Sequence, residues 1–194
     1  MPLMPREHLD ELDRLASYYW WHVHRIETTA NLIAHFAKGQ RLSSYLDIGC
    51  GPGATTRQIA NRLENSGLLA RPANVTGVDF DVSLLKNCHE HGVNLVVSNL
   101  AAGAMPALER RFELFTALDI LEHLEEPGRL LAALKPHLTE NALGVISVPA
   151  YEWLFSDWDR AAGHRRRYNA ASLQALLLGA HFNVVWQSYL YGFA

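Results

Sequence analysis

The sequence contains few cysteines, a slight excess of acid over base, and no long apolar run. Two cysteines in 194 residues exclude a disulfide scaffold and the usual cysteine-built zinc site. A formal net charge of −3 leaves no basic surface for nucleic acid. No run of about 18 apolar residues is present, so no transmembrane segment is expected.

The two ends of the chain carry further absences. Residues 1–6 include no apolar segment of the signal-peptide kind, so the expected localisation is cytoplasmic. From Tyr168 to Ala194 the sequence has no acidic residue, lysine or arginine. Polar residues interrupt this tail, which predicts a buried helix and a strand, with contact to a membrane surface as a weaker alternative.

The length of 194 residues corresponds to one compact domain. Apolar or small residues recur every three or four positions from Leu9 to Ala37, which predicts one long helix or two helices joined near Tyr18. We assign residues 1–40 to an N-terminal helical cap and residues 41–194 to the cofactor-binding domain. The cap includes four consecutive large aromatic residues, which cannot all face one core.

After residue 43, short apolar strands alternate with helices. Strands are expected at residues 44–48, 74–79, 94–98, 112–118, 143–148 and 182–191. Helices are expected at residues 54–63, 82–89, 128–138 and 170–178, the last capped by Asn169. The alternation predicts an α/β fold of the Rossmann-like, doubly wound type, with a mostly parallel sheet and helices on both faces.

The strongest local signal is a glycine-rich turn between a strand and a helix. Gly49, Gly51 and Gly53 follow the apolar strand at residues 44–48. Glycine is favoured where the chain leaves a strand with positive φ and where a ligand approaches the backbone closely. Such a ligand lies at the carboxyl end of the strand, against the N-terminus of the following helix. The turn therefore predicts a ligand-binding site.

The same turn matches the dinucleotide pattern G-x-G-x-x-G/A, with Ala54 in the last position, so an NAD-dependent oxidoreductase is one alternative. Two carboxylates argue against a dinucleotide. Asp47 would repel a pyrophosphate and suits a ligand that carries an ammonium group. Asp79 lies 28 residues beyond Gly51, further than the roughly 20 of nicotinamide sites. Its carboxylate, at a strand end, can accept hydrogen bonds from ribose hydroxyls.

The block LDIGCGPG, from Leu46 to Gly53, resembles the first motif of class I S-adenosylmethionine-dependent methyltransferases, and Val78-Asp79 resembles the second. The resemblance implies methyltransferase activity, with S-adenosylmethionine as cofactor and S-adenosylhomocysteine as its product. It also implies that Asp79 holds the ribose. The implied cofactor-binding residues are Asp47, Gly49, Cys50, Gly51, Gly53, Asp79, Phe80, Asn99, Leu100 and Asp119. Of these, Asn99 and Leu100 are expected at the adenine.

Residues 117–124 resemble the fourth-strand motif of quinone-type and type 11 or 12 methyltransferases, which lies beside the methyl group and the substrate. Asp119, Glu122 and His123 are therefore candidates for contact with cofactor or substrate. The alternative is that Glu122 and His123 begin a helix. The resemblance to quinone-type relatives leaves metal binding by Glu122 and His123 as an alternative, but adjacent residues make a poor metal site, so no metal is expected. For an alcohol acceptor, a neutral imidazole of His123 or His164 is the candidate base.

Residues 148–151 and 163–168 are similar to a bacterial subgroup linked with polysaccharide and other envelope biosynthesis. This similarity implies a small-molecule or a sugar- or lipid-linked acceptor, and O-methylation is preferred. Arginine forks bind carboxylate or phosphate, so residues 165–167 indicate an anionic acceptor. The alternatives are a solvated loop, or salt bridges to Glu152, Asp157 and Asp159. The candidate substrate-binding residues are Trp20, Trp21, Arg25, Tyr151, Arg166, Arg167 and Tyr168.

Class I methyltransferase folds have seven strands, whereas six are expected here. The seventh strand is therefore expected to be missing. An open sheet edge favours pairing between chains, which predicts a homodimer. A non-catalytic adenosyl-binding partner subunit is a further alternative, since it would bind the cofactor without turnover.

Overall fold

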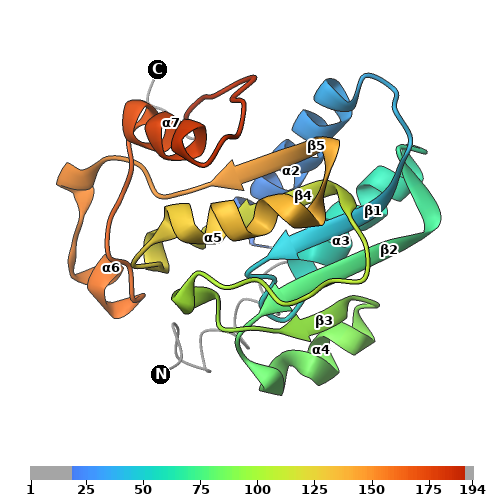
Figure 1. The fold of residues 1–194 in the computed structure, drawn as a ribbon, viewed down its shortest axis with the longest axis horizontal. Helices are drawn as coiled ribbons and strands as arrows, with labels where there is room; N and C mark the ends of the chain where they lie inside the picture. The colour runs from blue at the N-terminus through green and yellow to red at the C-terminus, as the bar shows by residue number, and fades with distance from the viewer. Residues whose placement is uncertain (1–18, 191–194) are drawn as a thin grey trace.

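The computed structural model describes residues 19–190, which form a parallel sheet flanked by helices (Figure 1). The five strands lie in the order β3-β2-β1-β4-β5, and each neighbouring pair is parallel. The predicted Rossmann-like α/β fold is confirmed. The strands are β1 (Leu42–Ile48), β2 (Leu69–Asp79), β3 (Asn94–Val97), β4 (Phe112–Leu118) and β5 (Leu138–Ser147).

Helices lie on both faces of this sheet. The predicted helix at residues 9–37 is confirmed from Trp20 onward, and residues 9–18 lie outside the described part of the chain. The α-helices are α2 (Trp20–Ala37), α3 (Ala54–Asn65), α4 (Leu85–Glu90), α5 (Pro127–Leu134), α6 (Asp157–Ala161) and α7 (Ala170–Gly179). The short 3-10 helices are η1 (Val82–Leu84), η2 (Leu100–Ala102), η3 (Leu121–His123), η4 (Lys135–His137) and η5 (Glu152–Leu154).

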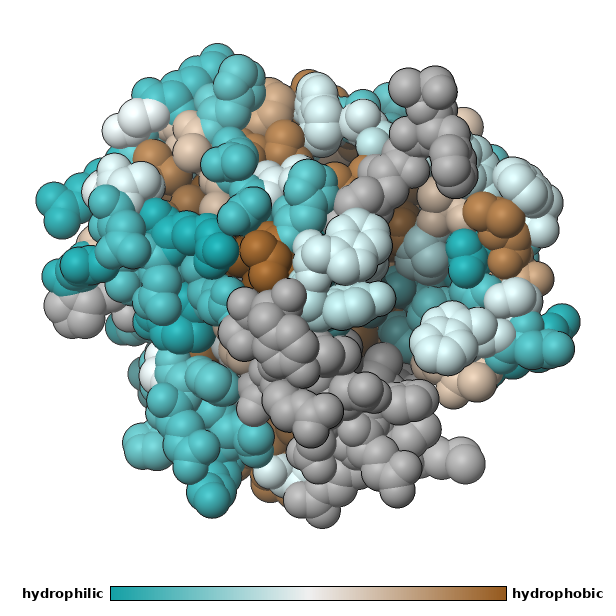
Figure 2. All heavy atoms as spheres, turned by 180° about the vertical axis from the view of Figure 1, so that it is seen from behind, coloured by the Kyte–Doolittle hydropathy of each residue, from teal (hydrophilic) through white to brown (hydrophobic). Residues whose placement is uncertain are grey.

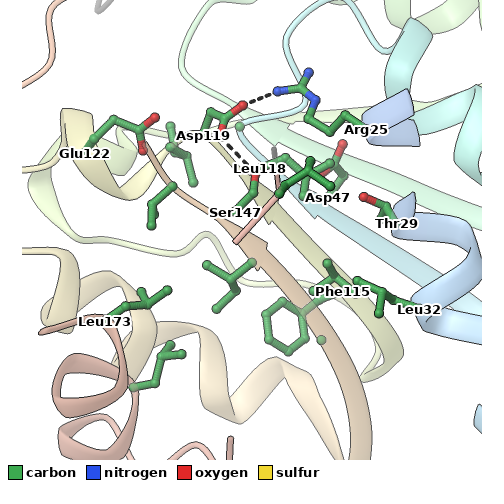
Figure 3. A pocket seen from close by; sticks show the side chains of 18 of the residues that line it. Arg25, Thr29, Leu32, Asp47, Phe115, Leu118, Asp119, Glu122, Ser147 and Leu173 are labelled. Atoms are coloured by element: carbon green, nitrogen blue, oxygen red, sulfur yellow. Dashed lines mark hydrogen bonds and ion pairs between the residues drawn. The ribbon is translucent and has the colours of Figure 1, made fainter. Parts of the chain in front are cut away.

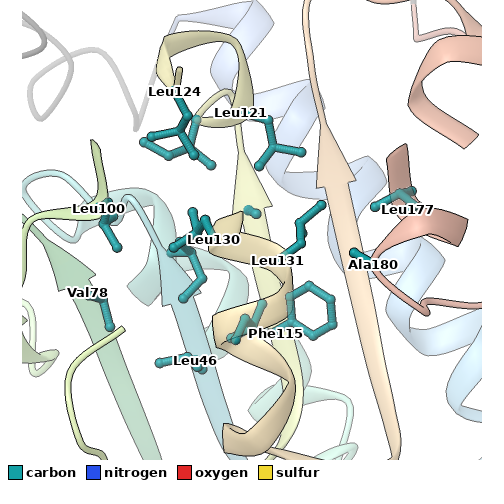
Figure 4. Packing of buried hydrophobic residues seen from close by; sticks show 14 of the residues in the cluster. Leu46, Val78, Leu100, Phe115, Leu121, Leu124, Leu130, Leu131, Leu177 and Ala180 are labelled. Carbon is teal, nitrogen blue, oxygen red and sulfur yellow. The ribbon is translucent and has the colours of Figure 1, made fainter. Parts of the chain in front are cut away.

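Side chains of each strand alternate between two cores, because successive strand residues point to opposite faces of the sheet. On β1, Tyr45 joins the core under α2 and α3, whereas Leu46 joins the core under α5 and α7. On β4, Leu114 and Phe115 repeat this division. Figure 4 shows the second core, to which Leu46 of β1, Phe115 of β4 and Leu131 of α5 contribute. Both faces of the sheet are therefore apolar and covered.

Helix α7 begins at the predicted cap. The side-chain oxygen of Asn169 accepts a hydrogen bond from the Ser172 amide at 2.8 Å, and the Ser172 hydroxyl accepts one from the Asn169 amide at 2.9 Å. This reciprocal pair satisfies two amides that would otherwise lack partners at the helix start. The helix contacts α5 and buries Leu177 in the core. The predicted helix in the uncharged tail is thus confirmed.

The predicted sixth strand is wrong, because residues 182–189 pair with no strand of the described chain. Side chains hold this segment instead. The Gln187 amide donates to the Ala170 carbonyl at 3.0 Å, and the Tyr189 hydroxyl accepts from the Ala170 amide at 3.1 Å. The Tyr189 ring also stacks on Tyr151, with centroids 4.9 Å apart. These contacts attach the segment to the start of α7, and β5 remains the sheet edge among the described residues.

Three strands begin earlier than predicted, β1 at Leu42, β2 at Leu69 and β5 at Leu138. Leu69 pairs with Leu42 and Leu138 pairs with Phe112, in each case beyond a register shift. The irregular pairing extends β5 through polar residues such as Glu140, which hydrophobicity alone assigns to a loop.

Seen from behind, hydrophilic side chains cover much of the visible surface, and apolar side chains form small separate groups (Figure 2). Large apolar side chains that are exposed singly, such as Val82 and Val185, are ordinary on a folded chain. Among the helices of residues 19–190, none combines the length and the apolar character that crossing a membrane requires.

Gly144 on β5 lies against the ring of Phe115 on β4, and a Cβ at residue 144 would lie 2.1 Å from Cζ of that ring. We expect Gly144→Ala to lower the free energy of unfolding by about 1–3 kcal/mol, because the ring must leave its place in the core. Gly179→Ala is the matched control, since nothing lies within 4 Å of a Cβ there. Urea unfolding measures both variants, and equal stabilities would contradict the packing described.

Candidate active site

The glycine turn leaves β1 through residues with positive φ, 76° at Gly49, 52° at Gly51 and 92° at Gly53. A Cβ at Gly49 would lie 2.9 Å from Cδ1 of Ile120, whereas nothing lies within 4 Å of a Cβ at Gly51. Packing therefore demands glycine at residue 49. At residue 51 the backbone faces open space along a cavity that the turn lines, so a ligand can approach it.

Asp79 lies at the end of β2, directly beside this turn. Its Oδ2 accepts the Gly51 amide at 2.9 Å, and its Oδ1 accepts the amides of Phe80 and Asp81 at 2.8 and 3.2 Å. A carboxylate has about four acceptor positions, so Oδ2 can still accept from a ligand hydroxyl. Burial raises the pKa of Asp79 despite these bonds. Asp79 does not cap the following helix, because Asp81 caps η1 by accepting the Ser83 amide.

The other residues implied at the cofactor differ in position. Cys50, Phe80 and Leu100 line the same cavity as the turn. Asn99 is exposed and is not among the lining residues, so its expected contact with the adenine lacks support. A hydrogen bond with Cys88, together with burial, raises the pKa of the Cys50 thiol well above its ordinary value. Cys50 is therefore un-ionised at neutral pH and is a turn residue rather than a nucleophile.

Asp47 is buried at the end of β1, on the sheet face that α2 and α3 cover. Its two oxygens accept hydrogen bonds from the hydroxyls of Thr56 and Thr116, each at 2.5 Å, and the Tyr45 hydroxyl lies 2.7 Å from that of Thr116. Burial raises the pKa of Asp47 to about 6, although both hydroxyl bonds oppose the rise. A cationic ligand group in the cavity would favour the ionised carboxylate.

An ion pair joins α2 to the end of β4 at the cavity wall (Figure 3). Arg25 donates a hydrogen bond to Oδ2 of Asp119, and the Ser147 hydroxyl at the end of β5 donates to Oδ1 at 2.9 Å. Asp119 has a φ of 55°, which is uncommon for a residue other than glycine. The substrate contact expected of Arg25 and the cofactor contact expected of Asp119 thus fall on the two partners of one ion pair.

The two tryptophans at the start of α2 differ in their position relative to the cavity. Trp21 lines the cavity, and the guanidinium carbon of Arg25 lies 4.6 Å from the centroid of its ring. Trp20 is 62% exposed and is not among the lining residues. Of the pair, Trp21 is therefore the residue placed to contact a ligand in the cavity.

Glu122, His123 and His164 meet at the carboxyl end of β4, and one oxygen or nitrogen from each lies within 4.8 Å of the others. Glu122 is fully buried, and neither of its carboxyl oxygens has a hydrogen-bond partner. Burial and the nearby Asp119 raise the pKa of Glu122 to about 9. Burial and the nearby His164 lower the pKa of His123 to about 4. Glu122 and His123 are therefore uncharged at neutral pH.

The three consecutive arginines at residues 165–167 bind acceptors inside the chain, which was the alternative to an anion site. Arg166 donates from Nη2 to the carbonyls of Leu124 and Glu125 at 3.0 Å each. Arg167 donates from Nε and Nη2 to the Asp159 carboxylate at 2.8 and 2.9 Å. Both side chains thus have acceptors inside the chain, although Nε of Arg166 is buried without a hydrogen-bond partner, and the expected anion site at Arg166 and Arg167 stays a prediction.

The remaining aromatic candidates differ in burial. Tyr168 is buried and donates its hydroxyl to the Leu121 carbonyl at 3.2 Å, so it supports the fold. Burial raises the pKa of Tyr168 to about 12. Tyr151 lines the cavity, as its expected role in substrate binding requires. Trp153 and Trp158 also line the cavity, and they are 79% and 74% exposed.

Ser147 and Thr116 belong to the site although nothing in their local sequence marked them, whereas Asp159 was named only as a possible salt-bridge partner of the arginines. Asp159 is fully buried and forms a capping box with Ser156. The spacing S-x-x-D is the local sequence signal of this cap. Ser147 and Thr116 reach the site through the register of β5 and β4, which only the paired strands define.

These elements surround one cavity of about 2560 Å³. It exceeds the roughly 300–1,000 Å³ of most small-molecule sites, because its lining continues from the glycine turn along β5 to the segment at residues 181–190. Polar strand ends and an apolar wall share this lining. The apolar wall includes Leu32, Phe36, Phe115, Leu118, Ile146, Leu173 and Trp186.

Curated relatives of the chain are distant. It is 22% identical over 165 residues to the ubiquinone biosynthesis O-methyltransferase of Pasteurella multocida (strain Pm70), which covers 74% of this chain and 64% of that protein. It is 34% identical over 94 residues to the trans-aconitate 2-methyltransferase of Rhodopseudomonas palustris (strain BisA53), which covers 47% and 34%. The chain thus spans about one third to two thirds of the length of these relatives.

Solved structures share the fold. The N-methyltransferase NodS of Bradyrhizobium japonicum WM9, in complex with S-adenosylhomocysteine, matches with a TM-score of 0.61 at 14% identity, over 90% of this chain and 83% of that one. The CMeT domain of the citrinin polyketide synthase matches with a TM-score of 0.67 at 16% identity, over 91% and 51%. At such identities the likeness concerns the fold alone.

The sheet order, the glycine turn and the carboxylate at the end of β2 define a class I S-adenosylmethionine-dependent methyltransferase. Residues 20–187 match a family model described as a methyltransferase domain, and the chain belongs to that family. The residues present fit the adenosyl cofactor of this class. Gly51 leaves the turn open, Asp79 offers an acceptor to the ribose, and Asp47 offers a carboxylate to an ammonium group.

The buried carboxyl of Glu122 makes the stability of the fold depend on pH. Its folded pKa of about 9 exceeds the ordinary 4.5, so the folded chain keeps a proton that the unfolded chain releases. Stability is therefore lost as pH rises from about 4.5 toward 9. We expect Glu122→Gln to unfold with a free energy roughly 2–4 kcal/mol above wild type at pH 7, and unchanged at pH 4. Urea titrations at both pH values measure this, and an equal gap at both would contradict it.

Proposed function

We propose that the chain transfers the methyl group of S-adenosylmethionine to a hydroxyl of a small-molecule acceptor with an apolar body. The observation that carries this proposal is one cavity lined by the glycine turn, by Asp79, and by the polar cluster of Glu122, His123 and His164. Residues suited to the cofactor and residues suited to moving a proton thus share one space. Methyl transfer to a hydroxyl needs both, because the reacting atoms must align and the oxygen must lose its proton.

The turn and its neighbours have distinct tasks toward the cofactor. Asp79 accepts from the ribose hydroxyls, Gly51 lets the backbone approach, and Asp47 stabilises an ammonium group. When bound, S-adenosylmethionine supplies an electrophilic methyl group attached to a sulfonium. Phe80 and Leu100 add apolar surface on the same side of the cavity.

The apolar wall supports an acceptor with an apolar or aromatic body, since such sites bury most of a ligand against apolar side chains. The relative named for ubiquinone biosynthesis is an O-methyltransferase, which supports a hydroxyl as the accepting group. A lipid-linked or sugar-linked acceptor is compatible with this wall. An anionic acceptor has less support, because Arg25 and Arg167 are already paired with Asp119 and Asp159.

Two other functions use the same turn. An NAD-dependent oxidoreductase is disfavoured by the Asp47 carboxylate beside the glycines and by the methyltransferase family. A non-catalytic adenosyl-binding subunit is disfavoured by the polar cluster around Glu122, which binding of the cofactor alone does not require. Pairing of two copies through the edge of β5 stays a prediction, which sedimentation equilibrium measures.

Asp79→Ala tests the cofactor site. We expect it to weaken the binding of S-adenosylhomocysteine by about 1–3 kcal/mol, because the ribose loses a carboxylate acceptor. Asp81→Ala is the matched control, since Asp81 caps η1 and does not line the cavity. Isothermal titration calorimetry on wild type and both variants measures the difference. Equal affinities of wild type and Asp79→Ala would contradict ribose contact at residue 79.

The reaction is tested with catechol as the probe acceptor, in an assay that measures release of S-adenosylhomocysteine. The proposal expects a methyl ether of catechol as the product. Heat from binding of NADH and none from S-adenosylhomocysteine would instead support an oxidoreductase. Binding of S-adenosylhomocysteine with no transfer to catechol or to other hydroxyl probes would support the non-catalytic subunit.

A further inference from the structure

The two candidate bases have different surroundings. His123 follows β4 in η3, and His164 lies between α6 and α7. Their rings meet edge to face, with centroids 4.8 Å apart, and both line the cavity beside Glu122. The partners of each ring nitrogen therefore decide which imidazole can take up a proton.

His164 has a buried carboxylate as its partner. Its Nδ1 lies 2.8 Å from Oδ1 of Asp159, and its backbone amide donates to the Asp159 carbonyl at 2.8 Å. Because an ionised carboxylate only accepts, Nδ1 must carry the proton, which leaves the lone pair on Nε2. An imidazolium at this position would be stabilised by the adjacent negative charge.

Asp159 is held in place and kept ionised by other groups. It is fully buried, and Arg167 donates two hydrogen bonds to its two oxygens. The amide and hydroxyl of Ser156 donate to Oδ2 at 2.9 and 3.1 Å. Burial acts to raise the pKa of Asp159, but the bonds from Arg167, His164 and Ser156 outweigh it and lower that pKa. The carboxylate is thus a fixed acceptor for the His164 ring.

His123 lacks such a partner. Its Nδ1 lies 3.3 Å from the Gly163 carbonyl, which accepts but carries no full charge. Burial and the neighbouring His164 disfavour its protonated form. The same cluster contains Glu122, whose two oxygens are buried and without a hydrogen-bond partner. A polar ligand group at this point would supply the missing partner.

We infer that Asp159 is the positioning residue for His164. An acceptor hydroxyl binds between Glu122 and Nε2 of His164, and this nitrogen removes the proton of the hydroxyl. This inference rests on the proposed methyl transfer to a hydroxyl. It separates His164, as the base, from His123, which packs against it. It also assigns a role to Arg167, which fixes the carboxylate that orients the base.

An electron pair of the acceptor oxygen forms the bond to the methyl carbon, and the bond from that carbon to sulfur breaks with its pair left on sulfur. The hydroxyl proton passes to Nε2 of His164. The ring is then an imidazolium, and its Nδ1–H still donates to Asp159.

The first test needs no acceptor. Ring ¹⁵N NMR on protein with labelled histidine reports which nitrogen carries the proton, and His164→Gln identifies the resonances of residue 164. We expect a neutral His164 ring with its proton on Nδ1. A proton on Nε2 of the neutral ring would overturn the inference, whether or not the chain transfers methyl groups. Calorimetry with S-adenosylhomocysteine tests the proposed function separately.

Kinetics with catechol as the probe separates positioning from support of the fold. We expect Asp159→Asn to lower kcat about tenfold or more, with the KM for catechol within about twofold of wild type. We expect the kcat–pH profile of Asp159→Asn to differ from that of wild type, because the carboxylate beside the base is lost. Ser156→Ala is the matched control, since it removes one hydrogen bond to the same carboxylate and leaves the His164 contact intact.

Three outcomes of this series overturn the inference. One is wild-type kcat in Asp159→Asn. Another is an equal loss of kcat in Asp159→Asn and Ser156→Ala with unchanged pH profiles, which would assign Asp159 to support alone. The third is saturable binding of Mg²⁺ or Zn²⁺ that Glu122→Gln abolishes, together with loss of activity on dialysis against EDTA. That result would mean an ionised Glu122 and an occupied Nε2.

Discussion

The hydrogen bond from the Gly51 amide to the Asp79 carboxylate joins the turn after β1 to the end of β2. Parallel pairing brings the two strand ends to one edge of the sheet, because Ile48 lies opposite Val78. The amide can point at the carboxylate since Gly51 has positive φ. This contact therefore lies on the cofactor side of the cavity, beside the open space at Gly51.

The strand order places the rest of the site on the other side of β1. Strand β1 lies between β2 and β4, because the chain adds β2 and β3 on one side of β1 and then crosses to its other side to form β4 and β5. In open α/β sheets, ligands bind in the crevice at such a reversal of strand order. Asp79 and the glycine turn lie on the β2 side, and Asp119, Glu122 and His123 lie at the end of β4. The residues suited to the cofactor and those suited to proton transfer therefore lie at different places along the carboxyl ends of the strands, and both groups line the cavity.

Buried polar groups impose a second constraint on this edge. Asp47, Thr116 and Tyr45 share one hydrogen-bonded chain on the face that α2 and α3 cover. The alternation of strand side chains and the pairing of Asp47 with Thr116 make that chain possible. Because the buried Asp47 carboxyl would be costly without partners, the hydroxyls of Thr56 and Thr116 are needed for the fold as well as for the site.

Local geometry explains which parts of the fold were predictable from sequence. A glycine turn and a carboxylate at a strand end are short-range features, so Gly49, Gly51 and Asp79 could be recognised directly. The cap at Asn169 is local in the same way, and it is confirmed. The sequence offered Asp159 only as one of three possible acidic partners of the arginines, because the choice among them depends on how the segment after α6 folds back onto the helix that contains Asp159. The segment at residues 182–189 has the apolar content of a strand, yet its side chains bind the start of α7.

A crystal structure of the chain with S-adenosylhomocysteine tests the central claim most directly. The account predicts ribose hydroxyls bonded to the Asp79 carboxylate and the sulfur on the side of the cavity that faces Glu122 and His164. A ligand bound outside this cavity, or a ribose with no contact to Asp79, would contradict it.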